Sequence, residues 1–155
     1  MSWFDWHLIE KHADVHRFVC LLNARRLLRD VEHEYLRVSL NQLIGQADKR
    51  WHGVRLGQPD WTPESHTVVF EAVVERERLR VYIILNAYWE QLDFQLPLVG
   101  DQVCPWRRWI DTSFDSPLDI SPWNEAPVLS DRIYRAAARS VVVLFDKIGW
   151  QQLGE

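Results

Sequence analysis

The feature of this sequence that most constrains its fold is a change of hydrophobic period near residue 50. Beyond that point apolar residues recur at every second position, first in HTVVFEAVV and then in LRVYIILN. Successive side chains of a strand point to opposite faces, so this period predicts two strands, and the charged ERER between them predicts a hairpin turn. One face of each strand is then apolar, carrying Val68, Phe70, Ala72 and Val74 in the first and Leu79, Val81, Ile83 and Leu85 in the second.

Three more stretches extend the β region. The run SVVVLF, residues 140–145, suits a strand that is buried on both faces. LDFQLP alternates and is ended by Pro97, so we expect Leu92, Phe94 and Leu96 to point inward and Asp93 and Gln95 outward. PWRRWID alternates too, and it sets Trp106, Arg108 and Ile110 on one face against Arg107, Trp109 and Asp111 on the other.

Residues 132–139, RIYRAAAR, are ambiguous because three alanines favour a helix. We expect a strand, since Ile133 and Tyr134 precede the alanines and a β-branched run follows them without a breaker. Residues 113–131 hold three prolines and no sustained period, which predicts a long surface loop. The expected fold is therefore mainly β, an antiparallel β-sandwich of about six to eight strands.

The first third of the chain is helical in pattern. Asp14 is placed to cap a long helix over residues 14–29. The apolar residues of this helix cover more than one stripe of its surface. A short helix follows, because Ser39 and Gln42 form a capping box before the spaced residues Leu40, Leu43, Ile44 and Ala47. We therefore divide the chain into a helical segment, 1–48, and a sandwich domain, 49–155. The apolar long helix needs a partner, and a homodimer through it is one expectation.

Charge and composition exclude several classes of protein. The net charge of −4, without a block of like charges, argues against nucleic acid and anionic membrane surfaces as partners. No apolar run approaches the length of a membrane span, and the N-terminus lacks the features of a signal peptide, so a cytoplasmic location is expected. Cys20 and Cys104 form no paired motif and are expected to be buried free thiols.

No catalytic or cofactor motif stands out, so we expect no catalytic residue, no metal and no cofactor. His12 and His16 are spaced to share one helix face, but without a third ligand a solvated helix start is the plainer interpretation. Asp93, Asp111, Asp115 and Asp119 lie on outward strand positions or in loops, where solvated carboxylates are common.

Nine tryptophans are many for 155 residues. Exposed indoles can stack on the apolar faces of sugars, which makes Trp61, Trp89 and Trp123 candidate carbohydrate-binding residues. The alternative is that the indoles pack in the core or in an interface, and Trp3, Trp6 and Trp51 fit this better because apolar segments adjoin them.

The motifs together resemble a known family. SWFDW, EKHADVHRFVCLLNARRLLRD, WHGVRLGQPDW, ESHTVVF, ILNAYWEQLDFQLP, WRRWIDTS and ARSVVVLF follow one another as in the C-terminal end of isoamylase-type glycogen debranching enzymes of the α-amylase superfamily. The likeness covers nearly the whole chain. It implies that SWFDW follows the eighth strand of a (β/α)8 barrel, that the long helix is the last barrel helix, and that a C-terminal β-sandwich comes next.

In that family the barrel carries the catalytic carboxylates, two of which flank the scissile bond about 5 Å apart in a retaining glycosidase. The corresponding stretches would precede residue 1, so the resemblance carries no catalytic residue onto this chain. It also implies that WHGVRLGQPDW is the entry into the sandwich, where Gly53, Gly57 and Pro59 form a sharp turn and Trp51 and Trp61 pack.

The leading hypothesis is therefore a noncatalytic C-terminal domain of a debranching enzyme, an α-1,6-glucosidase, as a remnant or as one part of a split enzyme that packs on a catalytic barrel. The alternative is an independent α-glucan-binding module that uses exposed tryptophans. A stand-alone hydrolase with a new site is the third possibility.

Overall fold

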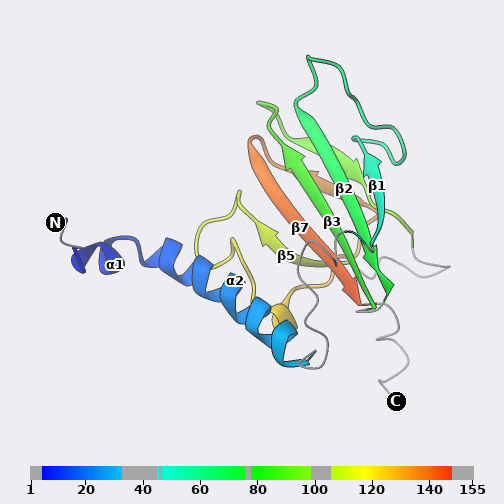
Figure 1. The fold of residues 1–155 in the computed structure, drawn as a ribbon. Helices are drawn as coiled ribbons and strands as arrows, with labels where there is room; N and C mark the ends of the chain where they lie inside the picture. The colour runs from blue at the N-terminus through cyan, green and yellow to red at the C-terminus, as the bar shows by residue number, and fades with distance from the viewer. Residues whose placement is uncertain (1–4, 33–44, 46, 76–77, 99–105, 148–155) are drawn as a thin grey trace.

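A computed structural model describes residues 5–32, 45, 47–75, 78–98 and 106–147 of the chain (Figure 1). The predicted fold class is confirmed: the chain is mainly β and antiparallel, with one short and one long helix ahead of the strands. The elements are α1 (His7–Lys11), α2 (Ala13–Glu32), β1 (Asp48–His52), β2 (Thr67–Val74), β3 (Leu79–Asn86), β4 (Leu92–Gln95), β5 (Arg107–Asp111), the 3-10 turn η2 (Trp123–Glu125), β6 (Ile133–Ala136) and β7 (Ser140–Lys147).

The helical region differs from the expectation in its details. The short helix is α1, whereas the one expected near residues 39–47 lies outside the described residues apart from Gly45 and Ala47. Asp14 is not the cap of the long helix, because α2 begins at Ala13 and includes Asp14 in its first turn, where a carboxylate still favours the positive end of the helix dipole. Cys20 is exposed rather than buried, and Cys104 lies outside the described residues. No helix within the described ranges is long and apolar enough to cross a membrane.

The strands form two sheets. Five of them pair in the order β1-β2-β3-β7-β5, and β4 pairs with β6 in a second sheet of two strands. The predicted hairpin is confirmed as β2–β3, with Val74 opposite Leu79 at the turn and Thr67 opposite Asn86 at the far end. The stretch 132–139 contains the expected strand, β6, before the chain turns at Arg139 into β7. Residues 113–131 form the expected long connection, interrupted by η2.

The core lies between the two sheets. Phe94 and Leu96 are buried there, as their alternation predicts, and they pack with the indole of Trp106. From the five-stranded sheet the core receives the side chains of Val69, Tyr82, Ile84, Val142 and Leu144, and from β6 those of Tyr134 and Ala136. We call the side of the five-stranded sheet that carries these residues its inner face.

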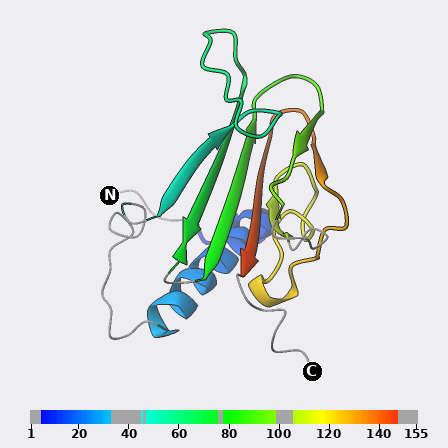
Figure 2. The ribbon, with the colours of Figure 1, turned by 90° about the vertical axis from the view of Figure 1, so that its right-hand side faces the viewer.

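The outer face of the same sheet is apolar as well. It carries the residues that alternate with the core set, namely Val68, Phe70 and Ala72 on β2, Val81, Ile83 and Leu85 on β3, and Val141, Val143 and Phe145 on β7. Phe145 is buried here, but Val141 is exposed, so β7 is covered on both faces only near its C-terminal end. Figures 1 and 2 show α2 along this outer side, across the lower part of the sheet.

The alternation expected for PWRRWID is wrong beyond Arg108. A β-bulge between Arg108 and Ile110 places Ile110 opposite Val143 on the outer face and Asp111 opposite Val142 on the inner face. Bulges insert one unpaired residue and so reverse the sides of all residues that follow. Asp111 consequently becomes buried, where its carboxylate accepts hydrogen bonds from the hydroxyls of Tyr134 and Ser113.

Candidate functional site

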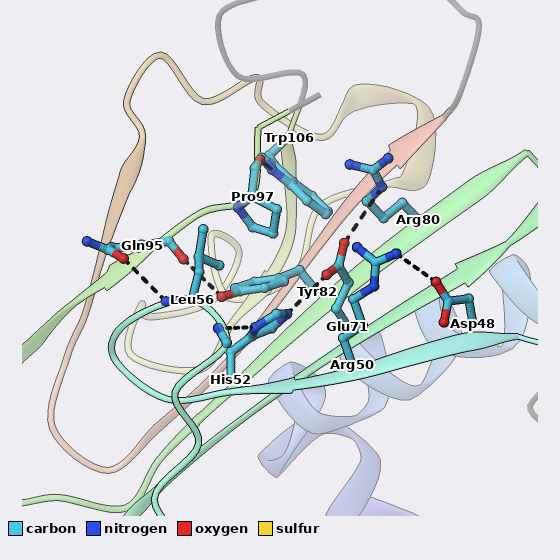
Figure 3. A network of polar contacts seen from close by, with 11 residues as sticks. Asp48, Arg50, His52, Leu56, Glu71, Arg80, Tyr82, Gln95, Pro97 and Trp106 are labelled. Carbon is cyan, nitrogen blue, oxygen red and sulfur yellow. Dashed lines mark hydrogen bonds and ion pairs between the residues drawn. The ribbon is translucent and has the colours of Figure 1, made fainter. Parts of the chain in front are cut away.

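A buried polar network lies at the end of the core next to β1 (Figure 3). Gly57 donates its backbone N–H to Nδ1 of His52 at 2.8 Å, and Nε2 of His52 is 3.0 Å from Oε2 of Glu71. The other carboxylate oxygen of Glu71 is 3.8 Å from Nε of Arg80. The side chains of His52 and Glu71 are almost wholly buried. The buried carboxylate of Glu71 on the inner face therefore has a hydrogen-bonding partner in His52 and a positive charge nearby in Arg80.

The aromatic rings around this network close it from solvent. The ring of Tyr82 lies 5.7 Å from that of His52, and its hydroxyl donates to the carbonyl of Gln95 at 2.9 Å. Burial raises the pKa of Tyr82, and the charge of Glu71 raises it further. The side-chain oxygen of Gln95 in turn accepts the N–H of Leu56 at 3.2 Å. These bonds hold the turn after β1 on the core, and the acid and base are too deeply buried to meet a substrate.

The turn that follows β1 confirms the role expected for two glycines. A Cβ at Gly53 would lie 2.4 Å from the carbonyl oxygen of Gln58, and Gly57 has φ +67°. Only glycine fits the first position without moving the turn, and only glycine adopts the second without strain. The expectation that Trp51 and Trp61 pack is met in part, because they contact each other edge to face with ring centroids 5.6 Å apart.

The apolar residues near these two indoles form one exposed surface. Trp51 stands opposite Phe70 across the β1–β2 ladder, their ring centroids 4.9 Å apart, and Ile83 and Val143 continue the same row. Trp51 is 46% exposed, Leu85 43% and Val141 37%. We call this set the outer apolar surface, and it comprises Trp51, Trp61, Val68, Phe70, Ile83, Leu85, Val141 and Val143.

The three tryptophans proposed for sugar binding do not form one site. Trp123 stacks on Phe145 with ring centroids 3.7 Å apart, and the guanidinium of Arg25 lies 4.2 Å from the same ring. A ring stacked on one face accepts a cation over the other, so Trp123 has no free face for a sugar. Trp61 is 64% exposed and belongs to the outer apolar surface. Trp89 is 59% exposed and lies beyond the end of β3, against the ring of Tyr88.

Other candidates add little. Trp6 is exposed on the turn before α1, and Trp3 and Trp150 lie outside the described residues. Within the described part of the chain no three metal-ligating side chains come together; His16 contacts the sulfur of Cys20 instead, with Nε2 3.6 Å from Sγ. An open hollow of about 700 Å³ beside β6 is bordered by the exposed ion pair of Asp93 and Arg135, 2.7 Å apart.

Comparisons with known proteins identify the family of the strand region. No curated protein sequence matches the chain. Among solved structures, a GH30 endoxylanase from Clostridium papyrosolvens C71 is similar with 11% sequence identity and a TM-score of 0.37, over 56% of this chain and 21% of the xylanase chain. This chain thus spans about a fifth of that protein's length. The family model described as "Isoamylase 1-3, C-terminal" matches residues 50–147, which is more than half of the chain and includes every strand except the start of β1. The chain therefore belongs to the family of isoamylase 1-3 C-terminal domains.

Proposed function

We propose that this chain packs, as a noncatalytic C-terminal domain, on a catalytic α-amylase-type barrel of an enzyme that debranches glycogen or a related α-glucan. The observation that carries this proposal is the outer apolar surface. An antiparallel sheet that faces water on one side normally places polar residues there. Here the outward positions of β2, β3 and β7 are apolar, and Leu85 and Val141 remain exposed.

The helix supports the same partner. Val15 and Val19, one turn apart on α2, are exposed, and α2 runs along the outer side of the five-stranded sheet (Figures 1 and 2). Exposed apolar side chains on both the helix and the sheet support a covering partner, because exposed apolar surface often marks interaction sites. A barrel is the partner that belongs to isoamylases in the resemblance described above, and its helical exterior would bury both elements.

Binding to a barrel tests the proposal. The barrel of an isoamylase-type enzyme would be produced without its own C-terminal domain and titrated with this chain by isothermal titration calorimetry. We expect a complex with the wild type and none with Leu85→Glu, since a charge on the outer apolar surface would have to be desolvated in the interface. Val141→Glu is a second variant of the same design at another exposed position.

The matched control is Ile133→Glu. Ile133 is also an exposed apolar side chain on a strand, but it lies on β6 of the other sheet. This variant is expected to bind the barrel as the wild type does. Absence of any complex, or equal loss of binding in Leu85→Glu and Ile133→Glu with unchanged thermal midpoints, contradicts the proposal. So does a homodimer that Leu85→Glu dissociates while the barrel stays unbound.

A further inference from the structure

A second exposed aromatic group lies at the end of the sheet, in the connection between β3 and β4. The register that sets Thr67 opposite Asn86 brings residues 87–89 beside His66, and the N–H of Ala87 donates to the carbonyl of His66 at 2.9 Å. The rings of Tyr88 and Trp89 lie 4.0 Å apart at 32°, and the imidazole of His66 is 5.8 Å from the indole. We call these three residues the Trp89 platform.

The backbone that carries the platform is held by a buried amide. Asn86 is 1% exposed, and its Nδ2 donates to the carbonyls of Glu90 at 3.1 Å and Ala137 at 2.8 Å. Its side-chain oxygen accepts the N–H of Tyr88 at 3.1 Å, and the carbonyl of Tyr88 accepts the N–H of Arg139 at 3.1 Å. The position of the platform is therefore fixed before a ligand arrives, which lowers the entropy that binding must overcome.

The indole of Trp89 is largely exposed although the rings of Tyr88 and His66 contact it. Tyr88 packs near one face of the indole, and the side chain is nevertheless 59% exposed. Trp61 contacts Trp51 edge to face at 72° as part of the outer apolar surface, and both faces of Trp123 are covered. Of the three candidate tryptophans, Trp89 combines contact with a neighbouring ring, inclined by 32°, with a side chain that is 59% exposed.

The chemistry of this position fits a sugar. A pyranose chair presents a patch of C–H groups to the electron-rich face of an indole, while its hydroxyls need polar partners at the rim. The residues next to the indole, Glu90 and Gln91, are exposed and polar, and so is Arg139. A small aromatic face with a polar rim matches the mixed surface of one hexose unit. We infer that the Trp89 platform binds a pyranose ring of a glycan chain, by stacking on the indole of Trp89.

Calorimetric titration of the full chain tests this inference with two soluble oligosaccharides, maltoheptaose for α-1,4-linked chains and cellohexaose for β-1,4-linked chains. We expect at least one of them to bind, and Trp89→Ala to weaken that binding about tenfold or more, as loss of a central aromatic contact does. Trp89→Phe is expected to retain part of the affinity. The oligosaccharide that binds identifies the linkage.

Trp61→Ala is the matched control, because it removes an indole of similar exposure that belongs to the outer apolar surface. Its affinity for the oligosaccharide is expected to equal that of the wild type. Thermal midpoints of all variants establish that each is folded. Failure of both oligosaccharides to bind, or binding that Trp61→Ala removes and Trp89→Ala does not, overturns the inference. Because no barrel is present, the result is independent of the docking experiment.

Discussion

His52 donates a hydrogen bond from Nε2 to the carboxylate of Glu71, 19 residues away on the neighbouring strand, over 3.0 Å. The N–H of Gly57 points at Nδ1, so Nδ1 carries no hydrogen and Nε2 must carry it. One imidazole therefore joins the turn after β1 to a carboxylate in the core.

We expect His52→Ala to lower the free energy of unfolding by about 3 kcal/mol, because it leaves the Glu71 carboxylate and the Gly57 amide buried without this partner. Urea denaturation of the wild type and the variant measures the difference. His66→Ala is the control, since His66 is exposed and its removal should cost less than about 0.5 kcal/mol. Equal effects of the two substitutions would contradict the importance of the network.

The contribution of the Asp146 carboxyl to the free energy of unfolding is expected to fall as pH rises. Burial raises the pKa of Asp146 above its ordinary value of 3.8, although the charge of Arg80 opposes the shift. The folded state thus binds this proton more tightly than the unfolded state, so its stabilising effect is complete below 3.8 and is lost as pH rises through the raised value. In Asp146→Asn we expect a smaller decline of the unfolding free energy from about pH 4 to about pH 7. Urea titrations at a series of pH values compare the two slopes.

Asp93 is expected to affect stability with the opposite dependence on pH, because its contribution is lost as pH falls. A hydrogen bond from Arg135 is the main cause that lowers the pKa of Asp93, so the contribution is present above 3.8 and disappears as pH falls through the depressed value. The difference in unfolding free energy between the wild type and Asp93→Asn should therefore become smaller as pH falls. The slope of unfolding free energy against pH therefore distinguishes the buried Asp146 from the exposed, ion-paired Asp93.

The two glycines of the turn after β1 should differ in their tolerance of alanine. Gly57→Ala places a side chain at φ +67° in open space, which costs about 1 kcal/mol. Gly53→Ala brings a methyl group within 2.4 Å of a backbone oxygen, so the turn must move and the unfolding free energy should fall further. Thermal unfolding by circular dichroism ranks the two variants. A milder effect at Gly53 would mean that the turn after β1 relaxes readily.

The sequence predicts the strands better than it predicts their faces. The alternation in β2 and β3 locates both strands, but their outer residues, such as Phe70 and Ile83, are as apolar as the inner Val69 and Ile84. Glu71 makes the inner face of β2 harder to recognise, because a charged residue normally marks the face of a strand that meets solvent. Its partner His52 lies on another strand, and nothing local in the sequence pairs them.

Contacts between distant segments explain the remaining differences. The bulge after Arg108 is not visible as a break in PWRRWID, yet it moves Asp111 into the core. Trp123 follows Pro122 in a loop and looks accessible, but Arg25 and Phe145 cover its ring from opposite ends of the chain. The sequence identifies Trp89 as a candidate for sugar binding and shows that Tyr88 beside it is aromatic, but it does not indicate that His66, which precedes the other strand of the hairpin, contacts the same indole.

Two arginines join α2 to the sandwich. Arg17 forms an ion pair with Asp119 and donates hydrogen bonds to Ser116 Oγ at 3.1 Å and to the carbonyl of Ile120 at 3.2 Å, while Arg25 covers Trp123. Ion pairs near the surface weaken as dissolved ions accumulate around them, whereas the strand ladders depend little on salt. Sodium chloride should therefore speed amide hydrogen exchange in α2 at lower concentrations than in β3 or β7. The helix would then detach from the sandwich in response to salt while the sheets stay folded.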